Sequence, residues 1–127
     1  MGFPSPAADY AEERISLDRE IIKHPAATDF FRVETDSMIN AFIPPGALLV
    51  VDRSIIPQNM DIVVAVVEGE FMCRYLTKNE YKARLLPANP KVKDILITAE
   101  MNVQIIGVVI RTIIDPKNLQ NVRAGRL

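Results

Sequence analysis

Ser37 is the residue of this chain whose type and setting point most directly to chemistry. Residues 30–38 have the pattern of a short strand that runs into a tight turn, and the turn presents the serine hydroxyl at the strand's end. A hydroxyl held in this way can act as a nucleophile if a neighbouring base removes its proton. A serine that follows an aspartate in a turn, as Ser37 follows Asp36, is more often a local cap or turn residue. Taken alone, the segment leaves both roles open.

The other reactive side chains lack the companions that catalysis or metal binding would need. His24 is the only histidine and precedes Pro25, so we expect it to end a helix and not to act as a base or metal ligand. Cys73 alternates with Phe71 and Tyr75, which is typical of a small core residue. No phosphate-binding glycine loop and no Cys/His zinc spacing is present, so neither a cofactor nor a metal is expected.

Length, composition and charge indicate one globular domain without an overall basic field. The chain has 127 residues, of which 49% are hydrophobic and 24% charged, with a net charge of −1. We therefore expect no direct contact with nucleic acid, and any such role to run through a protein partner. Lys78, Lys82 and Arg84 form a modest basic cluster that we interpret as a solvated face. A single cysteine and short apolar runs favour a cytoplasmic protein without a membrane association.

Seven β-branched runs, separated by turn signals, predict a mostly β domain after Asp29. The expected strands are residues 30–34, 48–52, 61–67, 70–76, 82–86, 95–98 and 103–113.

Before the strands we expect an extended proline-rich arm at residues 2–9 and a helix from Tyr10 to about His24, capped by Asp9. The helix either packs on the domain or stays exposed for a partner. This gives an arm with a short helix (1–24), a β-rich domain (25–116) and a polar tail (117–127).

An ordered series of motifs resembles the UmuD branch of the LexA-like S24 family, the Ser–Lys self-cleaving proteins of the SOS response. The likeness runs from residues 2–10, Gly-Phe-Pro-Ser-Pro-Ala-Ala-Asp-Tyr, through His-Pro-Ala-Ala-Thr at 24–28 and the serine segment, to about Ile110. It implies a LexA and signal-peptidase-like β-rich fold, with Ser37 as nucleophile. Arg74 takes the register position of the family's general-base lysine. Arginine has a pKa above about 12 and cannot accept the serine proton, so the resemblance implies an S24 peptidase site that is not competent as it stands.

The same resemblance places the family's cleavage boundary at Met1 and Gly2, so that the chain corresponds to the processed, UmuD′-like form. It implies an accessory subunit of an error-prone translesion DNA polymerase in SOS mutagenesis. The partners implied are a second copy in a homodimer, a UmuC-type Y-family polymerase, the RecA filament and a full-length UmuD-like precursor. We further expect the strand at 70–76 to lie beside the Ser37 turn, with Arg74 pointing toward the hydroxyl.

The alternative is an active Ser–Lys peptidase that cleaves itself or partner precursors. It requires Lys78 or Lys82 to reach Ser37 in place of Arg74. Lys78 lies four residues beyond Arg74, too far along a strand that rises about 3.3 Å per residue unless a bulge intervenes.

Overall fold

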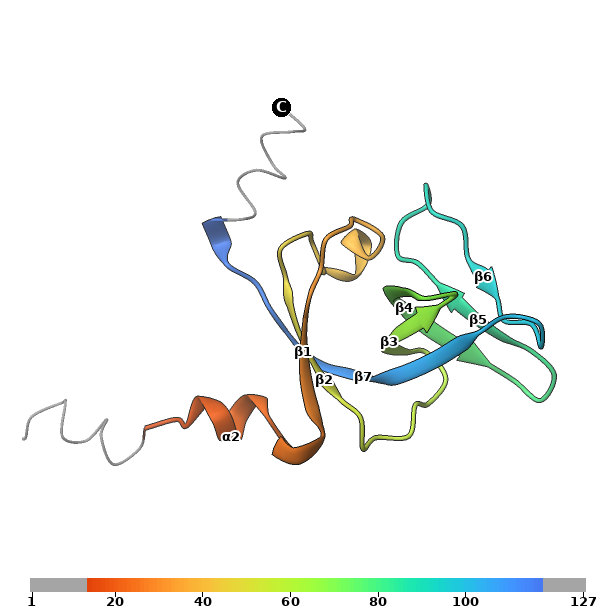
Figure 1. Ribbon diagram of the computed structural model, residues 1–127. Helices are drawn as coiled ribbons and strands as arrows, with labels where there is room; N and C mark the ends of the chain where they lie inside the picture. Colours follow the sequence, from red (N-terminus) through yellow and green to blue (C-terminus); the bar gives the residue numbers. More distant parts are fainter. Residues whose placement is uncertain (1–13, 118–127) are drawn as a thin grey trace, which may run out of the picture.

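The computed structural model describes residues 14–117, whose strands form one curved antiparallel sheet. The prediction of a mostly β fold is confirmed, because seven strands pair in the order β1-β2-β7-β3-β4-β5-β6 (Figure 1). Their bounds are β1 Thr28–Arg32, β2 Leu48–Asp52, β3 Asp61–Val67, β4 Glu70–Lys78, β5 Ala83–Leu86, β6 Ile95–Leu96 and β7 Val103–Ile113.

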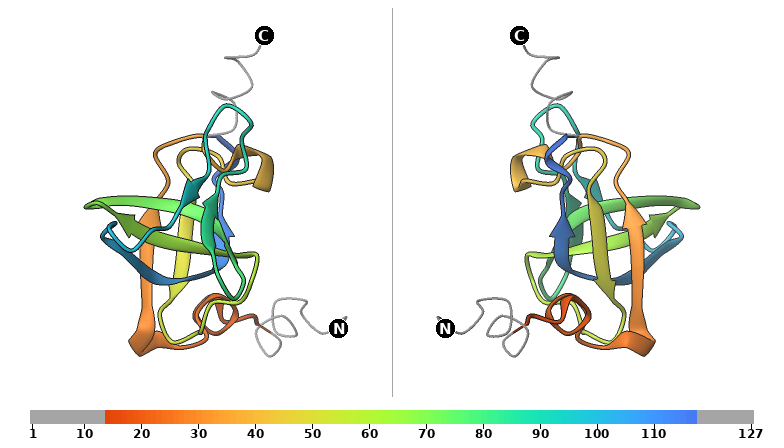
Figure 2. Two further views of the ribbon diagram at one scale, coloured as in Figure 1. Left: turned by 90° about the vertical axis from the view of Figure 1, so that its right-hand side faces the viewer. Right: turned by 90° about the vertical axis from the view of Figure 1, so that its left-hand side faces the viewer.

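β7 is the longest strand and joins two halves of the sheet. It lies between β2 and β3, and the register shifts along both of its ladders, which marks bulges on either side of Gly107. Bulges increase local twist, and in Figure 2 the orange and yellow strands β1 and β2 run across the direction of the green β3–β4 hairpin. At Gly107 a Cβ would stand 2.7 Å from the carbonyl oxygen of Asp52, so only glycine allows this approach of backbones.

Each half of the sheet has its own apolar cluster. The first cluster packs around β2 and the Ser37 turn, and the second lies under β3, β4 and β5. The buried members of the first are Val33, Met38, Ile43, Ala47, Leu49, Val51 and Val64. Those of the second are Val63, Ala65, Val67, Leu76, Leu85 and Val108. Met38, which directly follows the candidate nucleophile Ser37, is buried in the first cluster and so fixes the serine beside it.

Within the described residues, the helix before the sheet is shorter than the sequence predicts, because residues 14–16 and 22–24 are not α-helical. α2 spans Leu17–Ile21, and Ser16 caps it by accepting a hydrogen bond from the backbone of Arg19 at 3.4 Å. None of its residues is buried. A short helix without a packed face gains little stability from its own hydrogen bonds, which accounts for its length. The expected arm at 2–9, the cap Asp9, the expected helix start at residues 10–13 and the polar tail from residue 118 onward lie outside the described residues.

Candidate functional site

Ser37 lies in the turn between β1 and the 3-10 helix η2, Ile39–Ala41. Its residue surface is only 7% exposed. The hydroxyl oxygen accepts a hydrogen bond from Thr35 Oγ1 at 3.1 Å, and η2 has no side-chain cap. The hydroxyl is therefore not used as a helix cap, which is the ordinary role of a serine in this sequence context.

The loop that follows β5 holds the Ser37 turn in place. The amide of Ala88 donates to the carbonyl oxygen of Ser37 at 2.8 Å, and the amide of Asn40 donates to the carbonyl oxygen of Ala88 at 2.9 Å. The buried Asn89 side chain adds a hydrogen bond from Nδ2 to the carbonyl oxygen of Asp36 at 3.0 Å. The sequence showed this loop only as a turn signal, since no local pattern reports a contact with a turn fifty residues away.

Arg74 occupies a covered position on β4, with 8% of its surface exposed. Its Nη1 donates to the carbonyl oxygen of Cys73 at 2.7 Å, and its Nε has no hydrogen-bond partner among the described residues. Burial removes hydration and lowers the pKa of Arg74 from its ordinary value. Arg74 lies on the same face of β4 as Met72 and Leu76, because residues two positions apart on a strand point to the same side of the sheet. Both of those neighbours pack in the second cluster.

Ser37 and Arg74 are brought to the same loop but share no hydrogen bond. The β4–β5 ladder pairs Tyr75 with Leu86, so Arg74 lies level with the start of the loop whose Ala88 binds the Ser37 turn. Among the hydrogen bonds of residues 14–117, the guanidinium donates only to its own strand. That Arg74 points toward the Ser37 hydroxyl thus stays a prediction.

The two alternative bases lie at the opposite end of the β4–β5 hairpin. Lys78 pairs with Ala83 in the last step of that ladder. Lys78 and Lys82 both line a separate pocket at the hairpin tip. The structure therefore does not bring either lysine to the serine turn.

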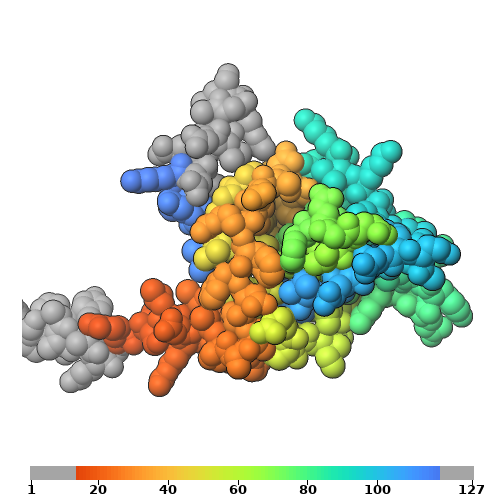
Figure 3. Space-filling model, viewed as in Figure 1, coloured from red at the N-terminus to blue at the C-terminus, as the bar shows by residue number. Residues whose placement is uncertain are grey.

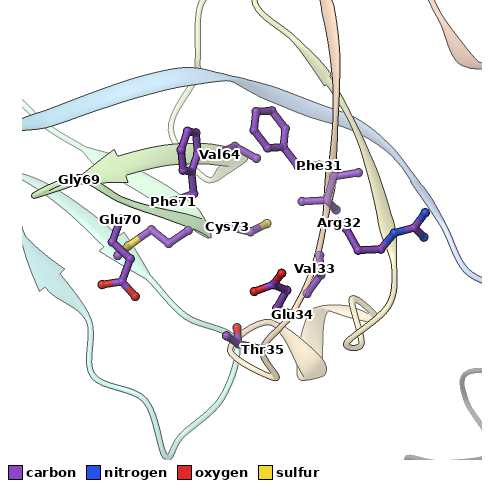
Figure 4. A pocket seen from close by; sticks show the side chains of 12 residues that line it. Phe31, Arg32, Val33, Glu34, Thr35, Val64, Gly69, Glu70, Phe71 and Cys73 are labelled. Carbon is purple, nitrogen blue, oxygen red and sulfur yellow. The ribbon is translucent and has the colours of Figure 1, made fainter.

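A groove of about 400 Å³ opens beside the site, between β1 with its continuation and the β3–β4 hairpin (Figure 4). The rings of Phe31 and Phe71 face each other across one end, with centroids 5.6 Å apart. Glu34 and Glu70 belong to opposite walls of the groove, and the Cys73 side chain points from β4 toward the wall that β1 forms (Figure 4). Burial raises the pKa of Cys73 to about 12, so its thiol stays protonated.

Within residues 14–117, both walls of the groove present strand edges without a partner in the sheet. In this part of the chain β1 pairs only with β2. β4 pairs with β5 from Tyr75 to Lys78, which leaves residues 70–74 without a neighbour on that side. Unpaired N–H and C=O groups of this kind can bind an extended peptide by adding it as a strand.

A second polar cluster, which the sequence did not predict, joins the N-terminal segment to the end of β2. His24 Nδ1 lies 2.5 Å from Asp52 Oδ2. The other oxygen, Oδ1, accepts from the amide of Ser54 at 2.8 Å and from its hydroxyl at 2.6 Å. The prediction that His24 ends a helix is wrong: α2 ends at Ile21, and the imidazole is committed to a carboxylate 28 residues away.

The carboxyl group of Asp52 has no exposed surface, whereas the His24 side chain is 58% exposed. Loss of hydration raises the pKa of Asp52, but the hydrogen bonds from Ser54 and His24 outweigh it and leave the pKa below its ordinary value. Asp52 is therefore ionised at neutral pH, and it holds the imidazole through Nδ1.

Comparison with known proteins gives the class to which this site belongs. The family model described as Peptidase S24-like matches residues 1–110. Protein ImpA of Escherichia coli is 39% identical over 125 residues, which cover 94% of this chain and 81% of that protein. Protein SamA of Salmonella typhimurium is 44% identical over 108 residues, covering 85% of this chain and 74% of SamA. LexA repressor 1 of Geobacter sulfurreducens is 40% identical over 110 residues, or 86% of this chain and 54% of the repressor.

The chain therefore belongs to the Peptidase S24-like family. Its likeness to ImpA and SamA places it on the UmuD side of that family, as the sequence motifs predicted.

Two further features bear on the site. Within residues 14–117, no three His, Cys, Asp or Glu side chains are grouped so that they could hold a metal ion. Over the same residues, no helix is both long enough and apolar enough to cross a membrane.

Proposed function

We propose that this protein is a non-enzymatic accessory subunit of an error-prone translesion polymerase, acting as a homodimer with a UmuC-type Y-family polymerase in SOS mutagenesis. The likeness to ImpA and SamA supports the assignment to UmuD-like mutagenesis proteins. The observation that carries the non-enzymatic part is Arg74, which stands on β4 where the resemblance places the family's lysine.

Within residues 14–117, no basic side chain forms a hydrogen bond with the Ser37 hydroxyl. Arg74 keeps its proton whatever its burial, because the guanidinium cannot be deprotonated in proteins. Among the side chains of residues 14–117, only that of Thr35 forms a hydrogen bond with the Ser37 hydroxyl, and it is not basic. Without a base the serine stays protonated and is a poor nucleophile.

Co-expression with a UmuC-type polymerase tests the proposal, with complex formation read by affinity capture and size-exclusion chromatography. We expect a complex that contains two copies of this chain. The Ser37→Ala variant is the matched control, because a non-enzymatic subunit should bind the polymerase and support mutagenesis equally well without the hydroxyl. Absence of association, or a loss of mutagenesis in a folded Ser37→Ala protein, would refute the proposal.

The second candidate function is an S24 peptidase that cleaves precursor partners in trans, and the groove favours it. The groove lies beside Ser37's turn and has two unpaired strand edges as walls, which suits an extended peptide. Incubation with a precursor that cannot cleave itself, at alkaline pH and with RecA filaments present, decides between the two functions. Product formed by this chain and lost in Ser37→Ala would establish the enzyme.

A further inference from the structure

A second pocket, of about 300 Å³, lies at the tip of the β4–β5 hairpin. The hairpin tip projects at the lower right of Figure 1 and forms the green projection at the right of Figure 3. All six residues that line the pocket are polar or cationic, and they are Asn59, Thr77, Lys78, Asn79, Lys82 and Arg84.

The hydrogen bonds around the pocket engage the side-chain oxygens of both asparagines and leave their NH2 groups free within residues 14–117. Asn59 Oδ1 accepts from the amide of Lys78 at 2.8 Å. Asn79 Oδ1 accepts from the amides of Tyr81 and Lys82, both at 2.8 Å. With both amide oxygens bound to the backbone, each Asn side chain has its NH2 group left to offer, and neither NH2 donates to any residue in 14–117. These bonds also fix the hairpin tip and tie it to the turn before β3.

The positive charges of the pocket are only partly compensated. Arg84 forms one contact with Asp94, from Nη1 to Oδ2 at 3.3 Å, which leaves most of its five donors unused. Within the described part of the chain, Lys78 and Lys82 form no ion pair, and no carboxylate lines the pocket. A lining without carboxylates, with free amide donors and three cations, fits an oxyanion such as a phosphate group.

An aromatic ring stands beside this pocket without any packing role. Tyr81 precedes Lys82 in the hairpin turn, and 88% of its surface is exposed. Proteins that bind single-stranded nucleic acid combine a cationic channel for phosphates with exposed aromatic rings on which bases stack. The hairpin tip has both parts, one residue apart.

We propose that the hairpin tip binds single-stranded nucleic acid, with a backbone phosphate in the pocket and a neighbouring base stacked on Tyr81. This inference goes beyond the proposed polymerase partnership and does not depend on it. It also revises the expectation from net charge, because a chain with a net charge of −1 still concentrates three cations at one place.

The test measures fluorescence anisotropy of a labelled oligothymidylate with the full chain over a series of salt concentrations. Removing both lysines, Lys78→Gln with Lys82→Gln, should weaken binding and reduce the salt slope by about 0.7, which is the change expected when one phosphate is no longer neutralised. Tyr81→Ala should weaken binding about five- to 150-fold while the slope stays the same. All these side chains are at the surface, and thermal unfolding of each variant checks that it folds.

The matched control is Lys91→Gln with Lys93→Gln, which removes the same charge from exposed positions that do not line the pocket. Equal losses in the two double variants would mean diffuse electrostatic binding and would overturn the proposal. A second arm titrates inorganic phosphate and follows the side-chain amide signals of Asn59 and Asn79 by NMR. Phosphate binding without oligothymidylate binding would overturn the nucleic-acid proposal and reduce the pocket to a site for a small anion, and absence of both would remove it.

Discussion

Replacing Asp52 by alanine should lower the free energy of unfolding by more than the same change at an exposed acidic residue. The carboxylate accepts three hydrogen bonds, two from Ser54 and one from His24, and has no exposed surface. Hydrogen bonds to a charged group contribute about 1.5 kcal/mol or more each, which gives about 4.5 kcal/mol for three. Because the half-exposed His24 regains water when its partner is removed, we expect a loss of about 3–4 kcal/mol. That is a large part of the roughly 5–15 kcal/mol typical of a domain.

Urea unfolding at pH 7 measures this loss, and Asp29→Ala is the control. Asp29 pairs with Arg53 at 2.8 Å, but both side chains are substantially exposed. An ion pair of that kind contributes less than about 1 kcal/mol. If Asp52→Ala costs no more free energy of unfolding than Asp29→Ala, the cluster at the end of β2 does not stabilise the fold, and the reasoning from burial and hydrogen bonding is refuted.

The same variant predicts a difference in pH dependence. The pKa of Asp52 is lowered in the folded state, so its contribution is fully present above the pKa of an unfolded aspartate and is lost as the pH falls through the folded value. Wild-type protein should therefore lose its advantage over Asp52→Ala below about pH 4. Melting temperatures of the two proteins, recorded from neutral to acidic pH, should converge. A constant gap would show that the carboxylate's ionisation is not what stabilises the cluster.

Three more substitutions or reactions test other parts of the structure. Arg74→Lys should give trans cleavage of a precursor that rises with pH, while Arg74→Ala should not, and equal cleavage by the arginine form would place the base elsewhere. The Cys73 thiol, with its pKa raised to about 12, should resist iodoacetamide at about pH 8 until the protein is unfolded in urea. Rapid labelling of the folded protein would contradict the raised pKa of the thiol. Gly107→Ala should cost about 2–3 kcal/mol in urea unfolding, since the added Cβ meets the Asp52 carbonyl; an unchanged midpoint would mean that the backbones separate freely.

Much of the fold could be predicted from local sequence, because turns and strands are local. Glu68-Gly69 links the expected strands at 61–67 and 70–76, and both residues have positive φ, 49° and 82°, as a tight two-residue hairpin turn requires. The strands fall where β-branched runs occur, with ends shifted by about one or two residues. The helix was predicted too long, because its periodic pattern carries no information on whether a surface exists to pack it.

The site could be predicted only in part, because its contacts join distant segments. Ser37 was found from its own turn. Asn89, whose side chain holds that turn through Asp36, comes 53 residues after Asp36 in the sequence. The pairing of His24 with Asp52 has no local signature either, and His24 alone suggested only the end of a helix. Donor and acceptor use at Asn59 and Asn79 is likewise visible only in three dimensions.

The place of β7 in the sheet sets the order in which the chain can fold. β7 is the last of these strands to be synthesised, yet it lies between β2 and β3, so β1–β2 and β3–β6 cannot join within the sheet before it arrives. Leu48 pairs with Ile113, which makes this a contact of long sequence separation and predicts folding in milliseconds to seconds. Until then, the nascent chain exposes the edges of β2 and β3 at the same time. Each edge can pair with another unfinished chain, so slow synthesis of residues 103–113 would favour aggregation over folding.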